Sequence, residues 1–254
     1  MATQLLFYRN AVPVNAQRHK MTSVKAGDSF AFARNVNSVP LVASEFADAG
    51  AEMPIVFAGA GDNIVPTAIL GATGSQNAFV SGEGKWGGRY VPAFVRRYPF
   101  VFSHETSDGQ LVLHIDEEFE GCNTEDRGER LFDGEGNQTH YLKQVLRFLQ
   151  DYQRQFNRTR IFCQRLMEHD LLRDMEAKFT LPNGERRQLN GFKTVDRDRL
   201  KALDESVLMT MLKTDELECV YLHLASLRHF ASVAERSGAS EAAEAPVEPA
   251  GADA

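Results

Sequence analysis

Two ionisable residues near the middle of the chain have the spacing of metal ligands. His114 and Asp116 are separated by one residue in a segment whose pattern predicts a β-strand. Because alternate strand residues face the same side, His-x-Asp is the local half of the two-histidine, one-carboxylate site of nonhaem iron oxygenases. The second histidine would have to be one of His140, His169, His223 and His229, and the sequence does not choose among them. We favour the alternative, an exposed strand end running into the acidic residues 116–118, and predict no bound metal or cofactor.

Other signatures of catalysis are missing from the sequence. It contains no G-x-x-x-x-G-K-[ST] phosphate loop, no G-x-S-x-G elbow and no H-E-x-x-H. Nucleotide-dependent and common hydrolase mechanisms therefore lose most of their support. An enzyme, such as a metal-dependent hydroxylase, would have to use His19, Glu45, His114 or Asp116 as ligands or general bases. We favour a protein that is not an enzyme.

Charge and hydropathy exclude several kinds of partner. The 28 basic and 35 acidic side chains give a net charge of −7, which argues against binding to nucleic acid. The longest apolar stretch, residues 53–72, is interrupted by Asp62 and Asn63, so we predict no membrane insertion. With no readable leader peptide, we expect a soluble, cytoplasmic protein. The cysteines are too widely spaced for a disulfide framework or a zinc knuckle: Cys122, Cys163 and Cys219.

Two adjoining segments carry opposite charge. Residues 116–135 hold nine acids against Arg127 and Arg130, a net charge of −7. Residues 138–165 hold six basic residues against Asp151, a net charge of +5. We favour mutual solvation or intramolecular pairing of the two segments. In the alternative, the basic face of a helix binds an acidic partner or a phosphate once the acidic loop moves aside.

The most distinctive segment, residues 86–100, interleaves aromatic and basic side chains. It contains the only tryptophan, three arginines and four other aromatic residues. Such a segment can form a corner of the core in which guanidinium groups cover aromatic faces, or it can form a groove with an aromatic anchor and an arginine clamp. The residues that we predict to bind a partner are Trp86, Arg89, Tyr90, Arg96, Arg97 and Tyr98.

The hydrophobic pattern places these residues in an α+β fold. Short Val-, Ile- and Phe-rich segments between turn residues predict an antiparallel, strand-rich N-terminal half, with strands at 4–8, 30–33, 54–58, 67–71, 77–80, 100–104 and 111–116. From Thr139 the apolar spacing of three and four predicts a long helix that continues or breaks near Asn157. A β-hairpin at 175–195 and helices near 205–212 and 215–235 follow.

The predicted organisation has two parts and a tail. We expect residues 1–119 to form the strand-rich part and residues 120–236 the mainly helical part, both sharing one core. Residues 237–254 are rich in Ala, Glu, Pro, Gly and Ser, with four acids and no basic residue. Such a composition cannot bury enough surface to offset its ordering entropy, so we predict a disordered acidic tail.

The central segment also carries a family resemblance. Trp86, followed by Tyr90-Val91-Pro92-Ala93 and by Arg96-Arg97-Tyr98-Pro99-Phe100, resembles the core motif of the bacterial SapC family. The resemblance extends over nearly everything before the tail, through Val39-Pro40-Leu41, Pro54-Ile55-Val56-Phe57, Leu131-Phe132-Asp133 and Leu222-His223-Leu224. In that family the position of His114 is not usually histidine, which weakens the iron hypothesis.

The resemblance implies a role rather than a reaction. Members are described as surface-layer associated, and related genes often neighbour outer-membrane receptors and proteins similar to flavin-dependent tryptophan halogenases. We therefore expect an accessory protein that binds surface-layer, receptor or halogenase-like components in envelope uptake systems. Surface association rests on this resemblance alone. The alternatives are the metal-dependent hydroxylase and a partner subunit of a halogenase-like flavoenzyme.

Overall fold

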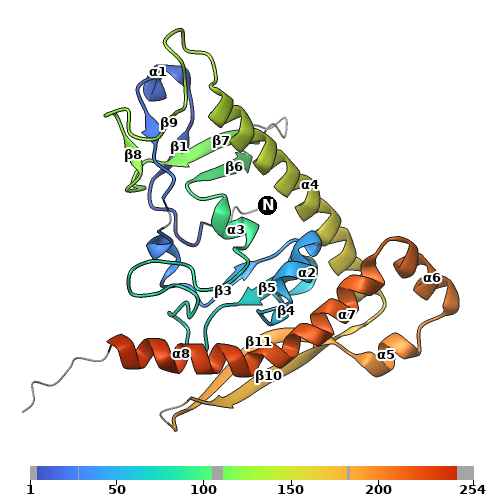
Figure 1. The fold of residues 1–254 in the computed structure, drawn as a ribbon. Coiled ribbons are helices and arrows are strands. Elements are labelled where there is room, and N and C mark those ends of the chain that lie inside the picture. The colour runs from blue at the N-terminus through green and yellow to red at the C-terminus, as the bar shows by residue number, and fades with distance from the viewer. Residues whose placement is uncertain (1–4, 28, 105–110, 182–183, 245–254) are drawn as a thin grey trace, which may run out of the picture.

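The computed structural model describes residues 5–27, 29–104, 111–181 and 184–244. It has an α+β fold, and all strand pairings in the described part are antiparallel. The strands form one five-stranded sheet, in the order β10-β11-β4-β5-β3, and two three-stranded sheets, in the orders β1-β7-β6 and β8-β2-β9. Figure 1 shows the two small sheets at one end of the molecule and the large sheet at the other.

The elements follow one another along the described part of the chain, and the longest connection runs from the end of β5 at Ile69 to the start of α3 at Ala93. The strands are β1 (Ala11–Pro13), β2 (Ser23–Val24), β3 (Ser38–Pro40), β4 (Ile55–Ala58), β5 (Val65–Ile69), β6 (Phe100–His104), β7 (Leu111–Asp116), β8 (Cys122–Asn123), β9 (Glu129–Arg130), β10 (Leu172–Thr180) and β11 (Arg186–Val195). The α-helices are α1 (Ala16–His19), α2 (Phe46–Ala49), α3 (Ala93–Arg96), α4 (His140–Glu168), α5 (Arg197–Lys201), α6 (Glu205–Lys213), α7 (Glu216–Ser226) and α8 (Phe230–Glu244). The 3-10 turns are η1 (Ala31–Ala33), η2 (Ala43–Glu45), η3 (Gly61–Asn63) and η4 (Leu227–His229).

The main core surrounds the five-stranded sheet. Strand β4 is buried from Ile55 to Phe57, and α7 packs against β4 and β11 while α8 packs against β10. The rings of Phe46 and Phe57 both meet Phe162 of α4, with centroids 6.2 and 6.1 Å apart. This core draws on both halves of the chain, from Phe7 to Val233.

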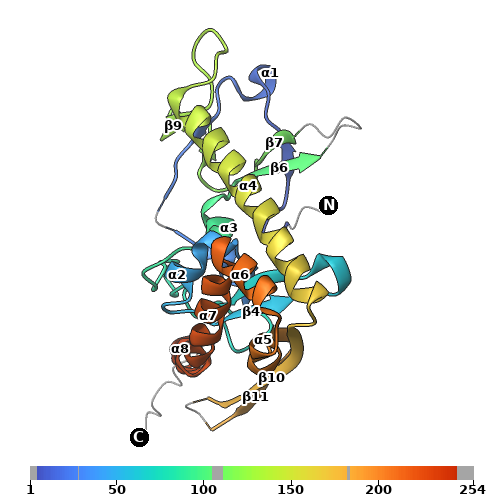
Figure 2. The same cartoon turned by 90° about the vertical axis from the view of Figure 1, so that its right-hand side faces the viewer.

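Helix α4 joins this core to a second one under the small sheets. Leu142 and Leu149 pack with Phe100 and Ile115 in the second core, whereas Phe162 lies in the main core. Its 29 residues run without interruption, so the helix continues through Asn157. Thr139 caps the helix by accepting a hydrogen bond from the Leu142 amide. Figure 2 shows α4 crossing one face of the molecule from one end towards the other.

Several sequence predictions agree with this fold. The predicted strands at 54–58, 67–71, 100–104 and 111–116 overlap β4, β5, β6 and β7, and the predicted hairpin is β10–β11. Asp196 caps α5 by accepting hydrogen bonds from the amides of Asp198 and Arg199. The connection between the predicted strands 100–104 and 111–116, and the middle of the predicted hairpin at 175–195, include residues outside the described ranges. No helix in the described ranges is both long enough and apolar enough to span a bilayer.

Three predicted strands are wrong. Residues 5–8 form a turn, residues 31–33 form η1, and residues 77–80 form a turn that contributes one isolated bridge, between Val80 and Trp86. These segments are apolar because their phenylalanines pack in an aromatic cluster rather than on a sheet. Phe7, for example, meets the rings of Phe94 and Tyr98 edge-on at 5.5 and 5.6 Å.

The predicted start of the disordered tail is also wrong. Helix α8 continues to Glu244, and Ser237 is fully buried, with its hydroxyl accepting a hydrogen bond from the Ala72 amide at 2.9 Å. This tertiary contact stabilises the helix where composition predicts none. Residues 245–254 lie outside the described part of the chain.

Candidate functional site

The first half of the central motif is built around the buried carboxylate of Glu45. This side chain, at the end of η2, accepts hydrogen bonds from the Val42 amide (2.9 Å), the Ala93 amide (2.7 Å) and the Tyr90 hydroxyl (2.8 Å). Burial raises the pKa of Glu45, while these three donors act in the opposite direction. Arg96 in turn donates to the Tyr90 hydroxyl at 3.3 Å. Glu45 therefore positions the motif, and its oxygens are occupied.

Trp86 and Arg89 lie beside this group. The Trp86 indole donates to the carbonyl oxygen of Tyr90 at 2.8 Å and stacks on Phe79 with ring centroids 5.6 Å apart. The carboxylate of Glu52 accepts hydrogen bonds from the amides of Arg89 and Tyr90. Trp86 and Tyr90 are half-buried, and Arg89 and Arg96 are exposed. These four side chains thus remain accessible on one stretch of backbone.

Arg97 is buried, whereas Tyr98 is half-buried like Trp86 and Tyr90. The Arg97 guanidinium is 8% exposed and lies 3.9 Å from the centroid of the Phe94 ring. Tyr98 stacks on Phe32 at 4.2 Å and donates to the Asp116 carboxylate at 3.2 Å. The structure therefore buries Arg97 and leaves the other five predicted binding residues half-buried or exposed.

Asp116 is a structural acceptor at the end of β7. Its carboxylate accepts hydrogen bonds from the amides of Arg9 (2.9 Å), Asn10 (3.0 Å) and Glu118 (3.1 Å) as well as from Tyr98. The side chain is fully buried. Binding of a metal here would require these four hydrogen bonds to be replaced.

His114 does not lie at an exposed strand end, and that expectation is wrong. It is 5% exposed because β7 is the central strand of its sheet. Its Nδ1 lies 3.1 Å from the Val112 carbonyl oxygen and 3.3 Å from the Ser103 hydroxyl. Within the described ranges, no three His, Cys, Asp or Glu side chains are grouped to hold a metal, so none of the four histidines proposed as the second ligand completes a site with His114 and Asp116.

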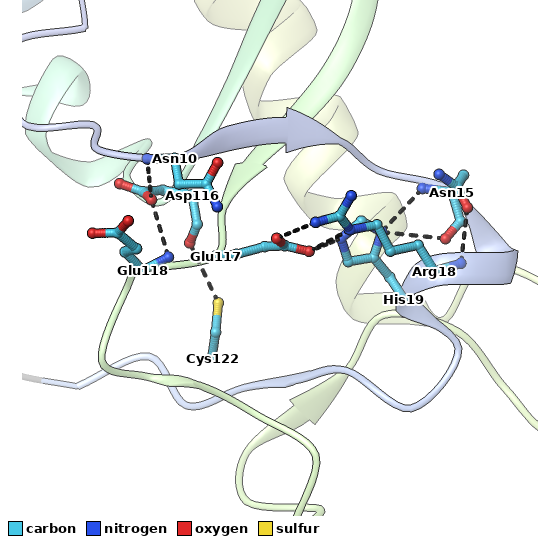
Figure 3. Close-up of polar contacts among 8 residues, drawn as sticks. All are labelled: Asn10, Asn15, Arg18, His19, Asp116, Glu117, Glu118 and Cys122. Carbon is cyan, nitrogen blue, oxygen red and sulfur yellow. Dashed lines mark hydrogen bonds and ion pairs between the residues drawn. The ribbon is translucent and has the colours of Figure 1, made fainter.

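His19 forms a second polar cluster with residues that follow Asp116 (Figure 3). Its Nε2 faces the Glu117 carboxylate at 3.2 Å, and its Nδ1 lies 3.2 Å from the Asn15 amide. The Nδ1 also lies 3.3 Å from the Asn15 carbonyl oxygen, so both ring nitrogens have polar partners. Arg18 binds Glu117 through two hydrogen bonds of 2.7 and 2.6 Å and is the main cause that lowers the pKa of that carboxyl. The cluster ties α1 to the end of β7.

His223 is a fully buried histidine of the main core. Its Nδ1 donates to the Ile55 carbonyl oxygen at 2.7 Å, and its Nε2 accepts from the Val195 amide at 3.1 Å. Desolvation lowers its pKa to about 4. The ring is therefore neutral and connects α7 to β4 and β11.

A surface that the sequence analysis missed lies on α5, α6 and α7. A groove of about 530 Å³ is lined there by Leu200, Lys201, Glu205, Leu208, Met209, Leu212, Leu217 and Tyr221. Three of its large apolar side chains are substantially exposed, Met209 by 50%, Leu212 by 57% and Tyr221 by 47%. Exposed apolar side chains gathered in one groove are typical of binding surfaces. We name this surface the α6–α7 groove.

The sequence contains a signal for this groove. Five of the nine residues of α6 are apolar: Val207, Leu208, Met209, Met211 and Leu212. At 100° per residue they cover about 200° of the helix surface, which is more than one packed face can bury. Met211 lies in the core, and Leu212 lies on the side left exposed.

A second groove lies between α4 and α7. It has a volume of about 610 Å³ and is bounded by α4, by α7 and by the turn from η2 to α2. Its floor includes Ile161 and Leu222, and its basic residues are Arg158, Arg165 and Lys213. Arg165 forms an ion pair with Glu216 of α7.

Comparisons with known proteins identify a family, but they match no curated protein and no solved structure. The family model for SapC matches residues 14–233 of the chain.

Proposed function

Because the chain belongs to the SapC family, we propose that it is a non-catalytic accessory protein that binds other proteins in surface-layer or envelope uptake systems. The observation that carries the proposal is the α6–α7 groove, which leaves Met209, Leu212 and Tyr221 about half exposed. The hydrogen-bond geometry supports it, since the buried groups that could act as acids, bases or ligands are engaged in holding the fold. Partners of this kind include receptor, surface-layer and halogenase-like components.

The occupant that we propose for the α6–α7 groove is an amphipathic helix of the partner. The groove is lined mainly by apolar side chains, and its charged lining residues are Lys201 and Glu205. A helix that places apolar residues at every third and fourth position fits such a groove. Full burial of one large apolar side chain stabilises a complex by about 1.5–3 kcal/mol, so covering three that are half exposed contributes about 3 kcal/mol.

The accessible part of the central motif is a second contact surface in this proposal. Trp86 and Tyr90 would serve as the aromatic anchor, and Arg89 and Arg96 as the arginine clamp. Arg97 would support this surface from the interior, and the half-buried Tyr98 would lie beside it. The exposure of Arg89 and Arg96 supports this assignment.

Affinity capture with the full-length protein tests the proposal. We expect a receptor, surface-layer or halogenase-like protein to be captured at low salt, and the purified partner to bind the full chain in a titration. The double variant Met209→Glu/Leu212→Glu should weaken that binding at least about tenfold, because charge replaces about 1.4 kcal/mol or more of apolar contact. The control Met21→Glu alters a methionine of similar exposure, 51%, far from the groove in sequence and should bind like wild type.

Two results would refute this function. One is the absence of any such component from the captured proteins at low salt. The other is a purified partner whose affinity is unchanged in the groove variant.

A further inference from the structure

Helix α4 carries a line of exposed basic residues on its outer face. Lys143, Arg147, Arg154 and Arg158 are all exposed. At 100° and 1.5 Å per residue, they lie within an arc of about 60° and extend over about 22 Å of the helix. We name these four residues the cationic stripe. Its last member, Arg158, also lines the groove that contains Lys213.

Three of these four charges have no ion-pair partner in the described ranges. Within the described ranges, Arg154 is the one member of the stripe with an ion-pair partner, Asp151 at 2.7 Å. The neighbouring acidic segment is paired elsewhere, with Glu117 on Arg18 and Asp126 on Arg130. No ion pair in the described part joins the acidic segment to the stripe. The favoured expectation was mutual solvation or intramolecular pairing, and the described ion pairs include pairs within each segment and none between the two.

The stripe also works against the stability of its own helix. Lys143 and Arg147 are four residues apart, as are Arg154 and Arg158, and like charges at this spacing repel each other on a helix. The first turn of α4 contains no acidic residue, although acids there would favour the helix dipole. A row of charges that lowers helix stability and has little use inside the fold indicates a binding role.

We propose that the cationic stripe binds an extended acidic segment of a partner protein. The proposal rests on the proposed protein-binding function and names the chemistry of one partner segment. Residues four apart on α4 are separated by about 6 Å along the axis, and alternate residues of an extended chain by about 6.6 Å. Acidic residues at alternate positions of an extended chain therefore match the spacing within each pair, Lys143 with Arg147 and Arg154 with Arg158.

The charges of the whole molecule favour a polypeptide over other polyanions. The net charge is −7, and the acidic segment 116–135 directly precedes α4 in the chain. A bilayer or a nucleic-acid duplex presents negative charge over a wide area and would be repelled by these acids. A single acidic chain is narrow enough to contact the stripe without covering the acidic segment.

A fluorescence-anisotropy titration of the full-length protein tests the proposal. The probe is a labelled peptide of about eight residues with alternating Glu and Ser, which spans about 26 Å when extended. A second peptide carries Gln in place of Glu. We expect saturable binding of the Glu peptide alone at about 50 mM NaCl, weakened at least about threefold at 200 mM by screening.

Two variants with equal net charge separate the stripe from general electrostatics. Each exposed ion pair contributes about a 1.4- to 5-fold change in affinity, so Arg147→Glu/Arg154→Glu should weaken binding about tenfold or more. Lys20→Glu/Arg186→Glu makes the same charge change at exposed positions outside α4, where these residues have no ion-pair partner in the described ranges. This control should change the affinity less than about twofold.

Three results would overturn the proposal: no binding of the Glu peptide, equal weakening by both double variants, or tighter stripe-dependent binding of an oligothymidylate or of phosphatidylglycerol vesicles. Failure of the stripe can be distinguished from failure of the proposed function. If a partner loses affinity for the Met209→Glu/Leu212→Glu variant but not for the stripe variant, the proposed protein-binding function stands. Only the proposal that the stripe binds an acidic segment is then refuted.

Discussion

His223 makes the stability of the main core depend on pH. The neutral ring donates through Nδ1 to Ile55 and accepts through Nε2 from the Val195 amide. Protonation would place a second N–H against that amide, so the folded state disfavours the charged ring. Its pKa is accordingly lowered from 6.5 to about 4, with desolvation as the largest cause.

The sign and size of the effect follow from the difference in pKa. Between pH 6.5 and pH 4 the unfolded chain binds a proton at this position and the folded chain does not. The stabilising contribution is therefore complete above pH 6.5, falls as the pH drops through this window and levels off below pH 4. The full loss is about 3 kcal/mol, and about 2 kcal/mol of it occurs between pH 7 and pH 5.

The variant His223→Gln isolates this contribution. Glutamine retains one donor and one acceptor but does not titrate, and it loses the ring contact with Phe57, whose centroid lies 4.9 Å away. We expect the variant to have a free energy of unfolding about 1–2 kcal/mol lower than wild type at pH 7. At pH 5 the free energy of unfolding of the variant relative to wild type should be about 2 kcal/mol higher than it is at pH 7.

Urea unfolding followed by the fluorescence of Trp86 measures both values, because this is the only tryptophan. Other groups titrate equally in both proteins and cancel from the difference. His140→Gln, at an exposed position at the start of α4, should behave like wild type at both pH values. A difference between wild type and His223→Gln that is the same at pH 7 and pH 5 would refute the neutral, buried histidine.

Three further variants test the polar contacts of the fold in the same assay. Asp116→Ala should lower the free energy of unfolding by about 3–5 kcal/mol, because it orphans buried amide donors, and a loss below 1 kcal/mol would contradict the four hydrogen bonds. Thr139→Ala removes the hydroxyl that accepts from the Leu142 amide and should cost about 1 kcal/mol, whereas Thr139→Ser should restore most of it. Arg18→Ala breaks an exposed ion pair with Glu117 and should leave the urea midpoint nearly unchanged, so a shift as large as that of Asp116→Ala would show that the pair stabilises the fold.

The local spacing of apolar residues was sufficient to predict the elements that bury one face along their whole length. Helix α4 keeps its apolar spacing through Leu142, Leu149 and Leu166, and those residues are the ones buried. The strands of the β10–β11 hairpin also follow from the sequence. Period alone could not separate a strand from an aromatic turn at Phe7 or Phe79, because both bury their rings, and only long-range partners distinguish the two.

The sequence by itself determined the family, the α+β class, the long helix and the block of basic residues upon it. The tertiary structure alone decided what the individual polar groups do. Asp116 and His114 look alike as ligands in sequence, yet the fold fills the oxygens of Asp116 with donors from distant segments. It also left Leu212 and the cationic stripe in solvent. The reason is physical: hydrogen-bond satisfaction, burial and ion pairing depend on which distant residues meet, and no local spacing encodes those contacts.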